Sequence, residues 1–105
     1  MNHLGMVTVS IEKPDLKPGA QRCVTIKNKK FSLVNIEGRY YCIDNVCTHA
    51  GGPLCEGKID KFTVVCPWHG SAFDCRDGKV TTGPATEPIK TYSVKEKNGK
   101  LFIDI

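Results

Sequence analysis

Apolar and polar residues alternate along much of the chain, in short stretches separated by turns that contain glycine or proline. Alternation with a period of two, in segments rich in β-branched and aromatic residues, is typical of strands that bury one face. The segments that predict strands in this way are residues 6–11, 22–27, 31–36, 39–43 and 62–65. No segment has the periodicity of an amphipathic helix. The pattern therefore predicts an all-β fold, an antiparallel β-sandwich or barrel.

Two dipeptides mark tight turns between neighbouring strands. Glu37-Gly38 indicates a two-residue hairpin, and Asn98-Gly99 is the signature of a type I′ turn between segments 89–97 and 100–105. The apolar face of this last hairpin is expected to consist of Tyr92, Val94, Leu101, Ile103 and Ile105.

Two other segments are expected to lie outside the strands. Prolines in segment 13–19 rule out regular pairing there, and segment 57–61 is expected to interrupt the chain before the strand at 62–65.

Metal-binding side chains occur in two short boxes, Cys47-Thr48-His49 and Cys66-Pro67-Trp68-His69, each placed just after a predicted strand. Two Cys and two His could close one tetrahedral zinc site. They could also hold a two-iron, two-sulfide cluster, with both cysteines on one iron and both histidines on the other. Structural zinc sites usually pair like ligands within a loop, whereas each box here mixes Cys with His. The mixed spacing favours the binuclear group, and a zinc-stabilised binding module is the alternative.

The two boxes resemble those of Rieske-type [2Fe–2S] proteins, and the likeness runs from Tyr40 to Tyr92. The stretches that carry it are Cys47–Leu54, Cys66–Asp74, Gly78-Lys79-Val80 and Gly83-Pro84-Ala85. The resemblance implies a Rieske-like antiparallel β base, with a small cluster-binding subdomain inserted at about residues 44–86, all within one domain spanning 1–105. It also implies one [2Fe–2S] cluster per chain, held by Cys47, His49, Cys66 and His69.

Three positions distinguish the chain from the respiratory Rieske proteins that it resembles in its boxes. Those proteins have cysteines, joined as a disulfide, where Gly52 and Trp68 stand, and a tyrosine hydroxyl directed towards a cluster ligand where Phe73 stands. Two neutral imidazoles in place of two thiolates leave the oxidised centre uncharged, which places Rieske potentials at about −150 to +300 mV. Hydrogen-bond donors near the sulfurs raise the potential further. Without the disulfide and that hydroxyl, we expect a potential in the lower half of the range.

The pattern is similar to the soluble ferredoxins of bacterial aromatic-ring dioxygenases and related oxygenase systems. This resemblance implies a one-electron carrier, which is not itself an enzyme. It would accept electrons from a flavin- or NAD(P)H-dependent reductase and pass them to a terminal oxygenase that docks at His49 and His69. The alternative within redox chemistry is a small Rieske subunit of a larger enzyme such as nitrite reductase. The sequence contains no nucleophile–base pair, phosphate loop or dinucleotide fingerprint.

Composition and charge narrow the class of protein. A chain of 105 residues, 40% hydrophobic and 25% charged, corresponds to one ordinary globular domain. The net charge of +4 comes from lysines spread along the chain, which suits an acidic protein partner better than a nucleic acid. Segment 1–5 lacks the features of a signal peptide, and no apolar stretch is long enough to cross a membrane. We therefore expect a cytoplasmic monomer with no membrane contact.

The four cysteines outside the boxes have different settings. Cys23 and Cys42 lie in strand patterns and are expected to be small core residues, and Cys75 is expected to pack beneath the second box. Cys55 lies in a Gly/Pro loop and could pair with Cys75 in a disulfide, which the sequence leaves open.

Three residues beside the boxes have expected supporting roles. Asp44 and Asp74 are expected to cap turns through their side chains. Trp68, next to His69, is expected to shield the cluster in part.

Overall fold

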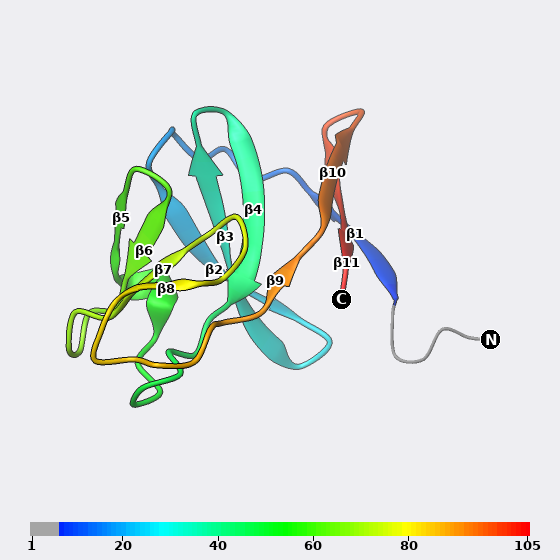
Figure 1. Ribbon diagram of the computed structural model, residues 1–105. Helices are drawn as coiled ribbons and strands as arrows, with labels where there is room; N and C mark the ends of the chain where they lie inside the picture. Colours follow the sequence, from blue (N-terminus) through cyan, green and yellow to red (C-terminus); the bar gives the residue numbers. More distant parts are fainter. Residues whose placement is uncertain (1–6) are drawn as a thin grey trace.

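The structure, a computed structural model, describes residues 7–105 as three antiparallel sheets (Figure 1). The strands are β1 (Thr8–Glu12), β2 (Gln21–Ile26), β3 (Lys29–Ile36), β4 (Arg39–Asp44), β5 (Lys58–Asp60), β6 (Thr63–Val65), β7 (Ala72–Asp74), β8 (Val80–Thr82), β9 (Thr91–Tyr92), β10 (Val94–Lys97) and β11 (Lys100–Asp104). One 3₁₀ turn, η1 (Leu54–Glu56), lies between β4 and β5 in the chain. The expected all-β class is confirmed. Residues 1–6, which include the predicted start of the first strand and the segment tested for an export signal, lie outside the described residues.

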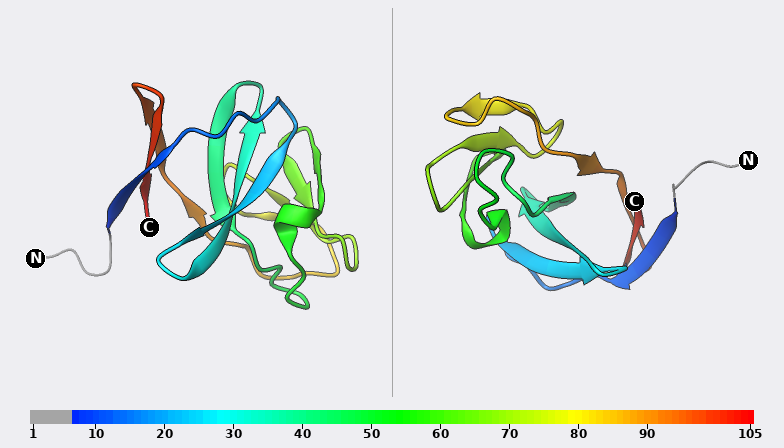
Figure 2. Two further views of the ribbon diagram at one scale, coloured as in Figure 1. Left: turned by 180° about the vertical axis from the view of Figure 1, so that it is seen from behind. Right: turned by 90° about the horizontal axis from the view of Figure 1, so that it is seen from below.

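The middle sheet, in the order β2-β3-β4-β9, lies between the other two (Figures 1 and 2). Its central strand β3 is buried from Phe31 to Ile36 because successive side chains point to opposite faces and both faces are covered. Phe31 and Leu33 belong to one apolar core, whereas Val34 and Ile36 belong to the other. We refer to these as the outer core and the inner core.

The outer core lies between the middle sheet and the sheet β1-β11-β10. Leu101 and Ile103 are fully buried in it, and the other apolar residues predicted for the last hairpin pack against it. Asn98 and Gly99 both have positive φ, at 53° and 76°, as a type I′ turn requires. The predicted type I′ hairpin is therefore confirmed between β10 and β11, whereas Tyr92 reaches the outer core from β9 of the middle sheet.

The inner core lies between the middle sheet and the sheet β5-β6-β7-β8, and it includes both Cys47 and Cys66. The chain leaves the middle sheet after β4, builds the four short strands, and returns to pair β9 with β4. The loops that carry the two boxes lie side by side at one end of the molecule, at the lower left of Figure 1.

Two sequence expectations were wrong. Segment 57–61 contains the strand β5, in which Ile59 pairs with Val64, and the turn begins only at Lys61 with φ of 56°. A three-residue strand is too short for its alternation to be recognised. Segment 89–97 is not one strand: β9 pairs with β4, the chain breaks at Ser93, and β10 pairs with β11.

Residues 7–105 contain no helix long and apolar enough to cross a membrane.

Candidate metal centre

The first ligand loop, residues 47–52, is a tight turn closed by two backbone hydrogen bonds. The N–H of Cys47 donates to the carbonyl of Gly52 over 2.9 Å, and the N–H of Gly51 donates to the carbonyl of Cys47 over 2.9 Å. Gly51 has φ of +79°, a left-handed conformation that strongly favours glycine. This turn leaves His49 exposed at its tip.

The second ligand loop, residues 66–71, repeats the same hydrogen bonds. The N–H of Cys66 donates to the carbonyl of Ser71 over 2.7 Å, and the N–H of Gly70 donates to the carbonyl of Cys66 over 3.2 Å. Gly70 has φ of +80°, almost the value of its counterpart in the first loop. The two boxes therefore fold alike although their histidines occupy different positions, and His69 is also exposed.

The two thiols meet in the inner core. Cys47 is 2% exposed and Cys66 3%, and their side chains are within hydrogen-bond distance of each other. Burial raises the pKa of the Cys66 thiol above its usual range, and the backbone N–H groups of Trp68 and His69 oppose that rise because they donate to its sulfur. These donors are of the kind that tune the potential of an iron–sulfur group.

The two imidazoles meet at the surface. The ring centres of His49 and His69 lie 5.1 Å apart with the ring planes at 85°. The four predicted ligands thus form a buried sulfur pair and an exposed nitrogen pair, each pair drawing one member from each loop. Within residues 7–105 no three His, Cys, Asp or Glu side chains are grouped so as to hold a single metal ion. The two-plus-two donor set fits a group with two metals and two protein ligands on each.

Comparison with known proteins identifies the family. The family model of the Rieske [2Fe–2S] domain matches residues 6–93. The chain belongs to the Rieske family. Its cofactor is therefore the Rieske [2Fe–2S] cluster, and zinc is set aside.

Several relatives of this Rieske protein are ferredoxins. The ferredoxin component of the naphthalene 1,2-dioxygenase system of Pseudomonas putida is 36% identical over 91 residues, which cover 87% of this chain and 88% of the relative. The 3-phenylpropionate/cinnamic acid dioxygenase ferredoxin subunit of Escherichia coli O139:H28 is 39% identical over 76 residues, which cover 71% and 72%. The chain is thus a Rieske ferredoxin akin to the electron-transfer components of dioxygenase systems.

Solved structures support the same grouping. The ferredoxin of Sphingomonas yanoikuyae B1 has a TM-score of 0.83 at 32% identity, over 90% of this chain and 93% of the other. A chain in the complex of reduced oxygenase and oxidised ferredoxin of carbazole 1,9a-dioxygenase has a TM-score of 0.83 at 28% identity, over 92% and 99%. The expected Rieske-like fold is confirmed.

Two of the positions at which this Rieske ferredoxin differs from the respiratory proteins depend on each other. A Cβ on Gly52 would lie 2.7 Å from the Cys66 sulfur and 3.1 Å from the Trp68 ring. Glycine at position 52 therefore lets the indole lie against the backbone of the first loop. Trp68 nevertheless remains 57% exposed, so the ring itself is only partly covered.

A third loop, residues 82–88, is attached to both ligand loops. The Thr48 hydroxyl donates to the carbonyl of Glu87 over 2.6 Å, and the N–H of Ala85 donates to the buried Ser71 hydroxyl oxygen over 3.0 Å. Because each bond comes from a different ligand loop, this segment holds the two loops in a fixed relation.

The expected turn-capping role is confirmed for one aspartate and wrong for the other. The Asp74 carboxylate accepts the N–H of Arg76 over 2.8 Å, and the Arg76 guanidinium lowers the pKa of that carboxyl. Asp44 instead accepts the Tyr92 hydroxyl over 2.6 Å and pairs with Lys29 at 3.2 Å. It therefore ties β4 to β3 and β9 just before the first ligand loop.

The cysteines outside the boxes differ from expectation in one respect. Cys23 is exposed and forms a disulfide with Cys55, so it is not a core residue, and Cys55 is not paired with Cys75. Val24 and Ile26 pack on the outer core, so the alternation of the strand places position 23 on the opposite face of β2.

The remaining two cysteines, Cys42 and Cys75, are buried free thiols, as expected. Burial raises the pKa of each to about 12, so both remain protonated and unreactive at neutral pH.

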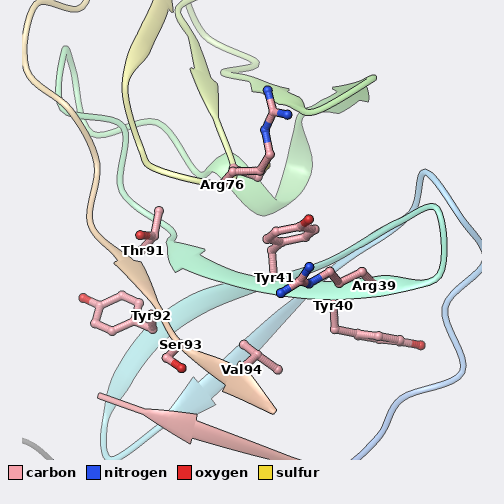
Figure 3. A pocket seen from close by; sticks show the side chains of 9 residues that line it. Arg39, Tyr40, Tyr41, Arg76, Thr91, Tyr92, Ser93 and Val94 are labelled. Atoms are coloured by element: carbon pink, nitrogen blue, oxygen red, sulfur yellow. The ribbon is translucent and has the colours of Figure 1, made fainter. Parts of the chain in front are cut away.

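A separate hollow of about 350 Å³ lies between β4 and β9 (Figure 3). It is lined by Arg39, Tyr40, Tyr41, Cys75, Arg76, Thr91, Tyr92, Ser93 and Val94. None of the four predicted ligands lines it, so it is not part of the metal centre.

We expect Cys66→Ser to abolish cluster binding, because the serine hydroxyl stays protonated and is a poor ligand for iron. Iron should fall from about two per chain to near zero, and the visible absorbance of the cluster should disappear. Cys42→Ala, which removes a buried thiol from the outer core, is the control and should keep both. Full iron content in Cys66→Ser would show that Cys66 is not a ligand.

We expect the midpoint potential to lie in the lower half of the Rieske range, below about +75 mV. Phe73→Tyr should raise it by about 60 mV, because Phe73 shares the inner core with both ligand thiols. A new hydrogen bond that favours the reduced state by about 1.4 kcal/mol corresponds to about 60 mV for one electron.

The matched control for this substitution is Phe31→Tyr, at an equally buried phenylalanine of the outer core. It should leave the potential unchanged in the same redox titration. A wild-type midpoint near the upper limit, or equal shifts in the two variants, would contradict the expectation.

Proposed function

We propose that this Rieske ferredoxin is a soluble one-electron carrier that takes electrons from a flavin- or NAD(P)H-dependent reductase and delivers them to the terminal oxygenase of an aromatic-ring dioxygenase. The observation that carries the proposal is the exposed imidazole pair, which brings the metal centre to the surface at one end of the molecule. The names of the relatives, which are ferredoxin components of dioxygenase systems, support it.

The proposal assigns Cys47 and Cys66 to one iron and His49 and His69 to the other. The bound cluster supplies reversible uptake of a single electron. The protein keeps water from the sulfur pair by burying it, and it presents the nitrogen pair to a partner. We assign cluster binding to a subdomain of about residues 44–86 within a single domain, 1–105.

The docking surface of the proposal is centred on the two histidines. Among the described residues, three large apolar side chains are exposed: Val46 at 57%, Trp68 at 57% and Val7 at 43%. Val46 and Trp68 belong to the ligand-loop region, whereas Val7 adjoins β1 on the other side of the molecule (Figure 1). An exposed aromatic beside the electron-transfer site is the kind of residue that contributes most to an interface.

The net charge of +4 suits an acidic face on a partner, because opposite charges speed up the encounter of two proteins. We further propose that the carrier is a monomer in the cytoplasm, since a diffusible carrier must meet its reductase and its oxygenase in turn.

The function is tested by reconstitution with a dioxygenase reductase and its terminal oxygenase. Hydroxylated product should form at a rate proportional to the ferredoxin concentration, and only when all three proteins are present. If the protein instead purifies in a stoichiometric complex with a larger reductase and does not support the oxygenase, the small-subunit alternative is correct.

We expect Trp68→Ala to raise the KM of the oxygenase for the ferredoxin at least tenfold, since truncation of an interface tryptophan typically costs about 2 kcal/mol or more. Val7→Ala, which removes an exposed apolar side chain far from the ligand loops, should leave this KM unchanged. Visible spectra and midpoint potentials of both variants show whether the cluster itself is altered; if they are unchanged, a higher KM reports weaker docking. Equal KM values for both variants would place the docking surface elsewhere.

A further inference from the structure

The disulfide between Cys23 and Cys55 joins the middle sheet to the segment that follows the first ligand loop. Cys23 lies in β2, opposite Ser32 of β3, and Cys55 lies in η1. Their Cα atoms are 5.1 Å apart, within the usual range for a disulfide. The bond therefore links two parts of the molecule that pack together but are distant in sequence.

The segment held by this bond is coupled directly to the residues that lead into the first ligand loop. The N–H of Leu54 donates to the carbonyl of Asn45 over 2.7 Å, and the N–H of Cys55 donates to the Asn45 side-chain oxygen over 2.8 Å. Asn45 is buried and lies just before Cys47. Movement of η1 would therefore be transmitted to the backbone that positions the Cys47 thiol.

Noncovalent contacts also hold η1 and the residue after it. The Gln21 side-chain amide donates to the carbonyl of Gly57 over 2.9 Å, and Leu54 is fully buried in the inner core. With the disulfide open, η1 keeps only these noncovalent contacts to the rest of the molecule, and no covalent bond limits the distance between position 55 and β2.

The two sulfurs differ in accessibility. Cys23 is on the exposed face of β2, whereas Cys55 is only 9% exposed. Thiol–disulfide exchange requires a thiolate to reach one sulfur and the other sulfur to leave, so attack is directed to Cys23. Cytoplasmic dithiols keep most accessible disulfides reduced, which makes an exposed one a reversible site there.

We propose that the Cys23–Cys55 disulfide is a thiol-redox site through which a dithiol reductant of the thioredoxin class controls how firmly the first ligand loop is held. A reductant thiolate attacks the Cys23 sulfur, the Cys23–Cys55 bond breaks, and Cys55 leaves as a thiolate that takes up a proton. The second reductant thiol attacks the mixed disulfide and releases Cys23, and the reductant becomes a disulfide. Two electrons and two protons pass to the ferredoxin.

Opening this bond removes the covalent link between η1 and β2, so the first ligand loop fluctuates more and releases the cluster faster. The oxidised form is the long-lived holoprotein, and the reduced form is the one that loses and regains its cluster. This inference concerns retention of the cluster; it rests on the proposed cytoplasmic location and not on the identity of the electron-transfer partners.

The test compares anaerobically purified holoprotein, treated or untreated with reduced thioredoxin, with the double variant Cys23→Ser/Cys55→Ser. Thiol alkylation and mass spectrometry identify which cysteines become free thiols. Decay of the visible absorbance in the presence of an iron chelator measures cluster loss. Thr25→Ala, which removes a side chain from the same exposed face of β2, is the matched control.

We expect thioredoxin to make Cys23 and Cys55 reactive and to accelerate cluster loss at least threefold in the wild type and in Thr25→Ala. The double variant should lose its cluster at the fast rate with or without thioredoxin. The proposal is overturned if thioredoxin does not reduce the Cys23–Cys55 disulfide. It is also overturned if the double variant retains the cluster as long as the oxidised wild type, or if thioredoxin accelerates cluster loss in the double variant as well. Because the wild type is tested with its sequence intact, poor folding of the double variant would not mask the result.

Discussion

The meeting of the Cys47 and Cys66 thiols in the inner core is the contact on which the rest of the centre depends. Both thiols come from loops with the same pair of backbone hydrogen bonds, so the sulfurs face inward while the histidines face outward. Burial of the sulfur pair keeps water away from it, and in the proposed function the exposed imidazole pair is the route by which the electron leaves. The same arrangement of the two loops thus buries the sulfur pair and exposes the imidazole pair.

Rigidity of the centre comes from attachments outside the ligand set. The segment 82–88 is bonded to both loops, the Asp44 carboxylate joins three strands at the entrance to the first loop, and the disulfide joins η1 to β2. Each attachment involves a residue remote in sequence from the loop that it supports. Two short loops with little core of their own are in this way held by the middle sheet.

Trp68 has two roles in this arrangement. Its ring lies against Gly52, where respiratory relatives have a disulfide, and its exposed part extends the surface around the histidines. Where the respiratory proteins that the chain resembles have two bridged cysteines, this chain therefore has a glycine with an apolar ring packed against it. The one disulfide of the described residues instead joins η1, which follows the first loop, to β2.

Short-range sequence patterns were sufficient to predict several strands, one hairpin and the kind of metal centre. Alternation identified β2, β3 and β4, Asn98-Gly99 identified the last hairpin, and the mixed spacing of the boxes favoured a binuclear centre, because each signal depends only on neighbouring residues. Only the tertiary structure showed that the chain crosses from the middle sheet to the sheet β1-β11-β10 at Ser93. It alone also showed that Asp44 binds Lys29 and Tyr92, and that Cys55 is bonded to Cys23. These pairings depend on which strands become neighbours, and a sequence contains that information only through the packing of the whole chain.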